Sequence, residues 1–304
     1  MSGNIRFLWR EAIDTAQWDS AVDRAANGAV YAYSFYLDAL CTHWAALVLN
    51  DYEAVMPLPW RRKYGIYYLY FPALIAQLGL FGNGLDAALL EAFLKAIPKQ
   101  FKIWSFPLNR HNLFMLPAFP LHQRTNFVLD LHRPYEEVYA AYRDNLKRNL
   151  KKAVGYGCAA KSDIDIKGVM ELAKAQTGPA AVAEEDLQRF ERLYHLLRSR
   201  QMATTYGVFT ARGELVASCV LTFSHRRAYY ILVGNHPNGR TLGASHLLID
   251  AFIKDHAGHD LLLDFEGSDL RNLAFFYSSF GAVNEPYAAI ELNRLPFYLK
   301  WLKK

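Results

Sequence analysis

The chain has 304 residues, of which 52% are hydrophobic and 21% are charged, and its formal net charge is +5. This composition excludes an intrinsically disordered chain, and so small a net charge means that a site for a polyanion must come from local clustering of basic residues. The length is sufficient for two packed domains.

The sequence has no signature of a membrane span or of a metal site. Arg6, Arg10 and Glu11 lie where a signal peptide needs an apolar core, and the longest apolar run, residues 72–82, is far shorter than the ~20 residues that cross a bilayer. We therefore expect a cytoplasmic protein. The three cysteines lack CxxC spacing, the histidines lack a paired metal-binding spacing, and no serine lies in GxSxG, so we expect no disulfide framework, no metal and no serine triad.

The segment between the two halves of the chain, residues 134–157, predicts one amphipathic linker helix. Pro134 suits a first helical turn, apolar residues follow at helical spacing, and Gly155 and Gly157 end the helix. Its polar side carries a cluster of basic residues, namely Arg143, Lys147, Arg148, Lys151 and Lys152. This basic cluster is a candidate site for a substrate phosphate or another anion.

The second half predicts an α/β unit. Residues 204–210, 214–223 and 228–234 are β-rich runs separated by turn-forming segments, which is typical of an antiparallel meander. A loop at 235–245 and a helix at 246–258 follow. A buried strand at 261–267 and a helix at 269–281 complete the unit.

The first half repeats this order at a nearly constant offset. Residues 50–70 align with residues 211–232 so that Tyr67 lies over Tyr229, 162 positions later. EAFLK at 91–95 aligns with DAFIK at 250–254, and the offset there is 159. The chain is therefore interpreted as a tandem duplication of one α/β unit.

The turn before the second predicted helix carries a phosphate-binding pattern. Gly239 to Ser245, GRTLGAS, lies between a predicted strand and a predicted helix, where backbone amides and the helix dipole favour an anion. Arg240, Gly243, Ala244 and Ser245 resemble the Arg/Gln-x-x-Gly-x-Gly/Ala loop of the GNAT superfamily of N-acetyltransferases, although Ser245 stands where that family prefers Gly or Ala. The resemblance implies that these four residues bind the pyrophosphate of acetyl-CoA or another acyl-CoA.

Two such units joined by a basic helix are similar to the FemABX-type and FemAB-like aminoacyl (acyl) transferases of this superfamily. The resemblance implies tandem GNAT-like α/β (α+β) units, each with a mixed, largely antiparallel sheet flanked by helices. It divides the chain into a first, acceptor-side domain at 1–133 plus 293–304, the linker helix at 134–157, and a second, donor-side domain at 158–292. It implies an acyltransferase that acts on a small-molecule or peptide amine held between the domains.

The donor and the catalytic state stay open at this point. Acyl-CoA is the favoured donor, and aminoacyl-tRNA, which peptidyltransferase members of the family use on a cell-wall precursor peptide, is the alternative. A non-catalytic module that binds a peptide or a nucleotide sugar is a third interpretation. The basic cluster on the linker helix correspondingly faces tRNA or a nucleotide-linked acceptor, the diphosphate of CoA, or only water.

Candidate catalytic residues follow from the chemistry of acyl transfer to an amine, which needs a neutral amine, a stabilised oxyanion and a protonated leaving group. Asp264 and Glu266 are two apart in a predicted strand and would share one face, as an acidic pair or as an incidental pair at a strand end. Tyr277 is a candidate donor of a proton to the leaving group; the alternative is that it only packs in the core. The backbone amides near Val233 and Gly234 are the candidates for stabilising the oxyanion.

The first repeat lacks the second repeat's donor pattern. Its equivalent turn, QLGLFGNGL, has glycines but no arginine, so we expect this half to shape the acceptor side. The candidates there for substrate contact are Trp60, Arg61, Arg62 and Gln77; the alternative is that they only solvate a hairpin turn.

Overall fold

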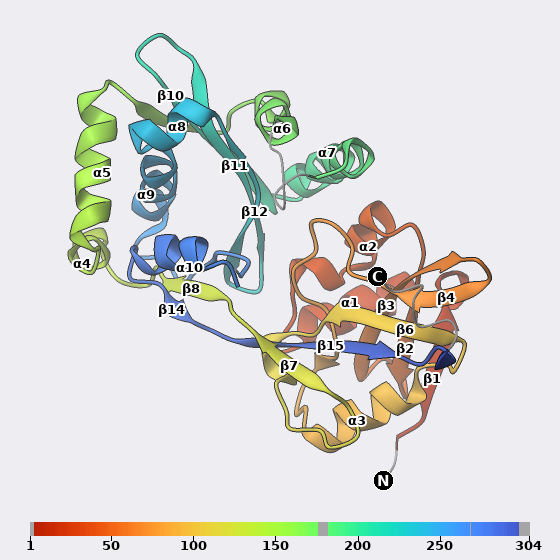
Figure 1. Ribbon diagram of the computed structural model, residues 1–304. Helices are drawn as coiled ribbons and strands as arrows, with labels where there is room; N and C mark the ends of the chain where they lie inside the picture. The colour runs from red at the N-terminus through yellow and green to blue at the C-terminus, as the bar shows by residue number, and fades with distance from the viewer. Residues whose placement is uncertain (1–2, 176–181, 268, 298–304) are drawn as a thin grey trace. The chain divides into compact units, whose positions relative to one another are not determined.

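A computed structural model describes residues 3–175, 182–267 and 269–297. The chain divides into two compact units, one of Met1–Arg124 with Pro286–Lys304 and the other of Thr125–Glu285 (Figure 1). No helix in these described ranges is long and apolar enough to cross a membrane. The expected packing of the chain's end on the first domain can be followed only as far as residue 297, because residues 298–304 lie outside the described ranges.

The first unit is built on one mixed sheet. The strand order is β1-β2-β3-β4-β6-β15-β7, β5 pairs with β3, and only β4 and β6 run parallel among the described strands. The strands are β1 (Ile5–Trp9), β2 (Trp44–Leu49), β3 (Ala54–Lys63), β4 (Ile66–Leu69), β5 (Phe81–Gly82), β6 (Phe101–Pro107), β7 (Leu121–Arg124) and β15 (Tyr287–Asn293). The helices are α1 (Thr15–Arg24), α2 (Ser34–Leu40) and α3 (Ala87–Ala96), with short 3-10 turns at Arg10–Ala12, Val30–Ala32 and Arg110–Asn112.

The second unit has a sheet of the same design, in the order β14-β8-β13-β12-β11-β10-β9, with β12 and β13 parallel. Its strands are β8 (Phe127–Asp130), β9 (Ala159–Ser162), β10 (Ala203–Phe209), β11 (Leu215–Ser224), β12 (Arg227–Asn235), β13 (Leu262–Asp264) and β14 (Val283–Asn284). Its helices are α4 (Tyr135–Ala140), α5 (Asp144–Gly155), α6 (Ile166–Lys174), α7 (Glu184–Ser199), α8 (Pro237–Leu242), α9 (Ala244–His256) and α10 (Arg271–Ser278).

Helices cover both faces of the second sheet. In Figure 1, α6 and α7 lie on one face, α9 lies on the other, and α5 packs outside α9. The contact of α6 is close: a Cβ at Gly234 of β12 would lie 2.5 Å from the Cβ of Leu172. Because only a glycine fits there, the helix approaches the strand backbone more closely than a larger residue would allow.

The tandem arrangement predicted from the repeat is confirmed by the strand topology. The first-unit order β1-β2-β3-β4-β6-β15-β7 corresponds position by position to β9-β10-β11-β12-β13-β8-β14, and the parallel pair occupies the same place in both sheets. Three pairs of equivalent strands begin 161 residues apart, namely β3 and β11, β4 and β12, and β6 and β13, and β2 and β10 begin 159 apart. The short sequence matches therefore reflect repeated structure.

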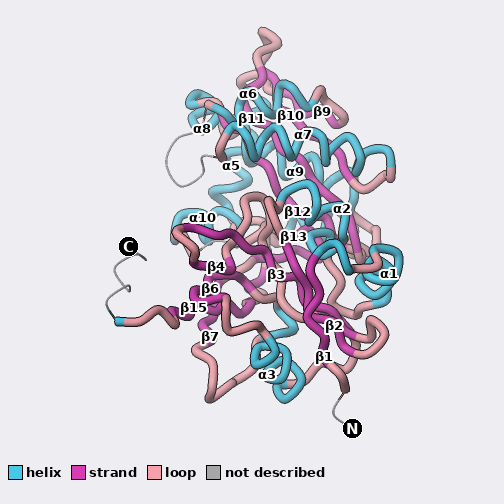
Figure 2. The backbone as a smooth tube through the Cα atoms, turned by 90° about the vertical axis from the view of Figure 1, so that its right-hand side faces the viewer, coloured by secondary structure: helices cyan, strands magenta, loops and turns pink. Residues whose placement is uncertain are grey.

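The two sheets exchange strands. β7 remains in the first sheet, while β8, which follows it after two residues, joins the second; β14 remains in the second sheet, and β15, which follows it after two residues, joins the first. Figure 2 shows β15 beside β6 and β7, which precede it by more than 160 residues. Neither sheet is complete without a strand from the other half of the chain.

The expected single linker helix is two helices, α4 and α5. The break falls at Arg143, whose extended backbone directs its N–H to the carbonyl of Ser279, 3.0 Å away, instead of to the preceding turn. Leu146, Leu150 and Ala153 then bury one side of α5 in the core of the second unit. The segment is thus packed as part of that unit and leaves its basic side outward.

We expect the returning strand to stabilise the first unit. Ile290 of β15 is fully buried in the core formed with β6 and α3, so Ile290→Ala should lower the free energy of unfolding by about 2–5 kcal/mol, measured by urea denaturation. Hydrogen exchange should speed up in β6, the partner strand of β15. Val283→Ala, at a 63% exposed position of β14, is the control. Unchanged protection of β6 in the Ile290 variant would contradict this assignment.

Candidate functional site

The candidate site of the second unit begins where β12 and β13 separate. These strands pair only through Arg227–Tyr229 and Leu262–Asp264, whereas β12 continues to Asn235. Among the described strands, none pairs with residues 230–235 on that side, although β11 pairs along the other side. The register between β11 and β12 shifts at Val220/Leu221, which is a bulge. The place of a further strand beside this part of β12 is thus not taken by any described strand, and an extended ligand is the kind of molecule that adds there.

The base of this opening is filled by aromatic rings. Phe265, directly after β13, stacks on Tyr277 of α10 with ring centroids 4.7 Å apart and lies 6.2 Å from the ring of Tyr230. Burial first, and the nearby charge of Glu266 second, raise the pKa of Tyr277. Its hydroxyl therefore stays protonated at neutral pH.

The turn expected to hold phosphate is more regular than predicted. Residues Pro237–Leu242 form the short helix α8, and Gly243 then caps α9 with a left-handed φ of 76°. A Cβ at Gly243 would lie 2.8 Å from the carbonyl oxygen of Asn149 in α5. Glycine is therefore required both by the backbone angle and by the contact with α5. The side chain of Arg240 lies outside the described part of the structure.

The first turn of α9 is tied to the end of β12. Ser245 donates its hydroxyl hydrogen to Oδ1 of Asn235 at 2.7 Å, and Ala244 is fully buried. Val233 and Gly234 lie in the same stretch of β12, paired with Cys219 and Ser218 of β11. The end of β12 and the start of α9 thus meet at one end of the sheet. The first carries Val233 and Gly234, and the second carries Gly243, Ala244 and Ser245.

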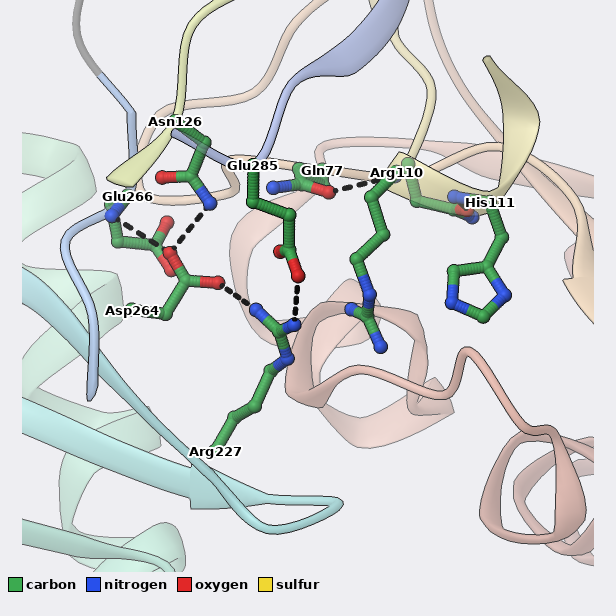
Figure 3. Close-up of polar contacts among 9 residues, drawn as sticks. Gln77, Arg110, His111, Asn126, Arg227, Asp264, Glu266 and Glu285 are labelled. Atoms are coloured by element: carbon green, nitrogen blue, oxygen red, sulfur yellow. Dashed lines mark hydrogen bonds and ion pairs between the residues drawn. The ribbon is translucent and has the colours of Figure 1, made fainter. Parts of the chain in front are cut away.

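Asp264 belongs to a buried ionic cluster (Figure 3). Its side chain is 2% exposed, and Oδ2 accepts from Arg227 at 2.7 Å while Oδ1 accepts from Nδ2 of Asn126 at 2.9 Å. Arg227, which is 3% exposed, also donates to Glu285 at 2.6 Å. Burial alone would lower the pKa of Arg227, but Asp264 and Glu285 outweigh it, so the pKa is raised and the guanidinium stays charged.

The expectation that Asp264 and Glu266 share one strand face is wrong. β13 ends at Asp264, and Glu266 follows it with a left-handed φ of 66°, its amide donating to Oδ1 of Asp264 at 3.0 Å. Because of this turn, Glu266 does not continue the alternation of side chains between the two faces of the sheet that a continuous strand would impose. Glu266 is half-buried and lies next to the protonated Tyr277, whereas Asp264 is already engaged by Arg227.

His246, in the first turn of α9, was not among the candidates from the sequence. Its ring meets Phe276 edge-on at 4.9 Å and stacks near Phe280 at 6.4 Å, and Nδ1 is buried without a hydrogen-bond partner among the described residues. Burial lowers the pKa of His246 to about 4. The imidazole is therefore neutral in the folded protein at neutral pH.

The basic cluster of α5 divides into engaged and exposed residues. The guanidinium of Arg143 lies 5.0 Å from the ring centroid of Phe275, and Lys147 donates to the carbonyl of Ala140. Four members of the cluster are exposed, namely Arg143, Arg148, Lys151 and Lys152, and Lys147 is half-buried. Arg148, Lys151 and Lys152 lie one turn or less from one another on α5.

The acceptor-side candidates lie in the first unit. Gln77 is 7% exposed, and its Oε1 accepts from the amide of Arg110 at 3.2 Å. Trp60 of β3 stacks on His43 with ring centroids 4.6 Å apart. The two are on different elements, and neither belongs to a cluster of catalytic side chains.

Sequence reasoning also missed Arg227, Asn126 and Glu285. Arg227 looked like part of a polar turn, yet it begins β12 and is buried. Asn126 directly precedes β8, and Glu285 directly follows β14. No sequence pattern connects these two residues. An arginine directly before the apolar run AYYILVG was the one available signal, because a charge at the start of a buried strand needs a partner.

Comparisons with known proteins agree with this geometry. Residues 140–271 match the family described as an acetyltransferase (GNAT) domain. The fold is similar to the crystal structure of FemX, with a TM-score of 0.63 and 12% identity over 98% of this chain and 99% of that one. At such identity the likeness establishes the fold alone. A comparison with curated proteins found no match.

Two further solved structures share the fold. A tandem GNAT protein from the clavulanic acid biosynthesis pathway has a TM-score of 0.56 and 13% identity, covering 96% of this chain and 99% of that one. L-PGS from Bacillus licheniformis has a TM-score of 0.56 and 10% identity, covering 95% of each chain. The tandem arrangement therefore extends over nearly the whole chain.

We expect His246 to make stability depend on pH. Its folded pKa of about 4 lies below its ordinary value of 6.5, so as pH falls from 6.5 the unfolded chain binds a proton that the folded chain refuses. The free energy of unfolding should therefore fall between pH 6.5 and about 4. His246→Phe should flatten this part of the profile, measured by urea denaturation at pH 7 and 5.

The control is His132→Gln, at an exposed position, which should keep the full slope. Burial also lowers the pKa of His256, so a residual slope is expected in the His246 variant. A profile in His246→Phe as steep as that of the unmodified protein would contradict the assignment.

Proposed function

We propose that this chain, which carries a GNAT acetyltransferase domain at residues 140–271 within a FemX-like tandem GNAT fold, is an N-acyltransferase that uses acyl-CoA. The observation that carries the proposal is the end of the β12–β13 pairing at Tyr229, past which β12 continues to Asn235 beside the first turn of α9. A strand that continues past its parallel partner suits a donor whose arm carries amide groups of its own.

Donor binding in this proposal uses backbone more than side chains. The pantetheine arm pairs with β12, and its diphosphate lies toward the start of α9, where Gly243 holds a left-handed turn. Arg240 supplies the charge-assisted contact, and Ser245 holds the end of β12 in place through Asn235. The divergence of β12 from β13 suits such a donor.

The chemistry assigns different tasks to the two carboxylates. Glu266, whose charge acts on Tyr277, takes a proton from the acceptor ammonium, and Asp264 is held by Arg227 and Asn126. The amine attacks the thioester carbonyl, and the backbone near Val233 and Gly234 stabilises the oxyanion. Tyr277 is protonated at neutral pH and donates its hydroxyl proton to the leaving thiolate. Asp264 thus positions the turn that presents Glu266, through its bond to the Glu266 amide.

Acetyl-CoA should raise the thermal stability of the protein. At ~100 times its dissociation constant, a donor stabilises the native state by ~2.7 kcal/mol, which corresponds to a rise of several degrees in Tm. Arg240→Ala should remove most of the rise, whereas Arg212→Ala, an exposed arginine in the β10–β11 turn, should keep it. No rise with acetyl-CoA or longer acyl-CoAs would refute the assignment of the donor.

Turnover should depend strongly on Glu266 and Tyr277, whereas binding of the acyl-CoA donor should depend on them much less. Glu266→Gln and Tyr277→Phe should each lower kcat about 100-fold, the lower range for general acid–base groups, while the thermal shift with acetyl-CoA persists. The assay is release of free CoA with a panel of primary amines and amine-bearing peptides. Glu214→Gln, on the exposed β10–β11 turn, is the matched control. Donor binding without turnover in the unmodified protein would instead identify a non-catalytic binding module.

A second candidate donor, aminoacyl-tRNA, is favoured by one observation. Arg148, Lys151 and Lys152 present three exposed cations on one helix, which suits a nucleic-acid backbone. An enzyme of this kind would transfer an aminoacyl group to an amine of a cell-wall precursor peptide. Aminoacyl-tRNA binding that weakens with salt and with loss of these three charges, together with no CoA effect, would select this donor.

A further inference from the structure

The β3–β4 hairpin of the first unit concentrates cations and aromatic rings. Residues 60–68 read WRRKYGIYY, and from residue 54 to residue 85 the sequence contains no acidic residue. β3 ends at Lys63, β4 begins at Ile66, and Tyr64 and Gly65 form the turn with left-handed φ angles. In Figure 1 this hairpin carries the β4 label. Its charge is thus entirely positive over more than thirty residues of chain.

Each cation of the hairpin lies near a tyrosine ring. The guanidinium of Arg61 is 4.2 Å from the ring centroid of Tyr70, that of Arg62 is 5.2 Å from Tyr67, and the ammonium of Lys63 is 5.4 Å from Tyr64. No ion pair links these cations to a carboxylate among the residues that the structure describes. The positive charges are therefore held on apolar rings and remain available to an external anion.

The turn and the flank of the hairpin expose large apolar side chains. Tyr64 is 80% exposed and Phe71 is 44% exposed. Rings that carry a polar tip, and cations with apolar stems, are the side chains that settle at the boundary between lipid headgroups and acyl chains. The combination of three unpaired cations with exposed rings at a turn matches an anionic, amphipathic surface.

Single-stranded nucleic acid is the other polyanion with apolar faces, and the geometry disfavours it. Base stacking needs open ring faces. Arg62 lies over Tyr67, Arg61 over Tyr70, and His43 stacks on Trp60 at 4.6 Å with an interplanar angle of 18°. The rings of Tyr67, Tyr70 and Trp60 thus each have one face covered, and the most exposed ring, that of Tyr64, stands at the turn beside the cations, as a headgroup layer requires.

We propose that the β3–β4 hairpin docks the first unit on an anionic phospholipid surface. Arg61, Arg62 and Lys63 bind lipid phosphates, and Tyr64 inserts at headgroup depth. This inference is independent of the acyl donor and of the catalytic residues, which belong to the second unit.

The test is co-sedimentation of the full chain with vesicles of equal parts phosphatidylglycerol and phosphatidylcholine, and with vesicles of phosphatidylcholine alone. We expect binding only to the anionic vesicles, weakening as salt rises. Each Lys or Arg near such a surface contributes about fivefold to partitioning, so the triple variant Arg61→Gln, Arg62→Gln, Lys63→Gln should bind on the order of 100-fold more weakly. Tyr64→Ser should also weaken binding without changing charge.

The matched control removes the same charge from α5, in the triple variant Arg148→Gln, Lys151→Gln, Lys152→Gln, and should retain vesicle binding. Circular dichroism and thermal melts establish that each variant is folded. Three results would overturn the proposal: no preference for the anionic vesicles, equal losses in both triple variants, or full vesicle binding by the folded hairpin variant. An oligonucleotide that binds the hairpin in preference to the vesicles would also overturn it and would indicate a nucleic-acid partner.

Discussion

The guanidinium of Arg227 holds together the part of the second sheet on which the candidate site depends. It binds Asp264 at the end of β13 and Glu285 just after β14, and Asn126, just before β8, binds the same Asp264. Arg227 and Asp264 are 3% and 2% exposed, whereas Glu285 is 25% exposed and lies at the rim of the cluster. Such a cluster adds little net stability over an apolar core, but breaking it would leave a buried charge without a partner.

The position of this cluster explains where the sheet opens. Arg227 begins the paired stretch opposite Leu262, Asp264 ends it opposite Tyr229, and past Tyr229 β12 no longer pairs with β13. The ion pair between Arg227 and Asp264 therefore spans the whole paired stretch, beyond which β12 continues alone to Asn235. Glu266 owes its place to the same anchor, since its amide is bound to Asp264. A buried structural carboxylate and a candidate proton acceptor thus lie two residues apart with different tasks.

The same cluster stands at the crossings of the chain between the two sheets. Asn126 follows the step from β7 toward β8, and Glu285 precedes the step from β14 to β15. Each sheet takes one strand from the other half of the chain. The first sheet is therefore complete only after β15 has been synthesised and has paired with β6 and β7. Long-range pairing of this kind has a high loop-closure cost, which the buried strand β15 offsets through its core contacts.

The sequence alone determined the order of the elements from β10 to α10 apart from α8, the tandem repeat, and the place of the glycine-bearing turn between β12 and α9, because these depend on local periodicity, glycine positions and a repeated pattern. It did not predict α6 and α7, the break between α4 and α5, the helical state of α8, or the different fates of Asp264 and Glu266. These were decided by tertiary contacts: a backbone bond from Arg143 to Ser279 and an ion pair from Arg227. Both join residues far apart in the chain, and neighbouring residues carry no record of such contacts.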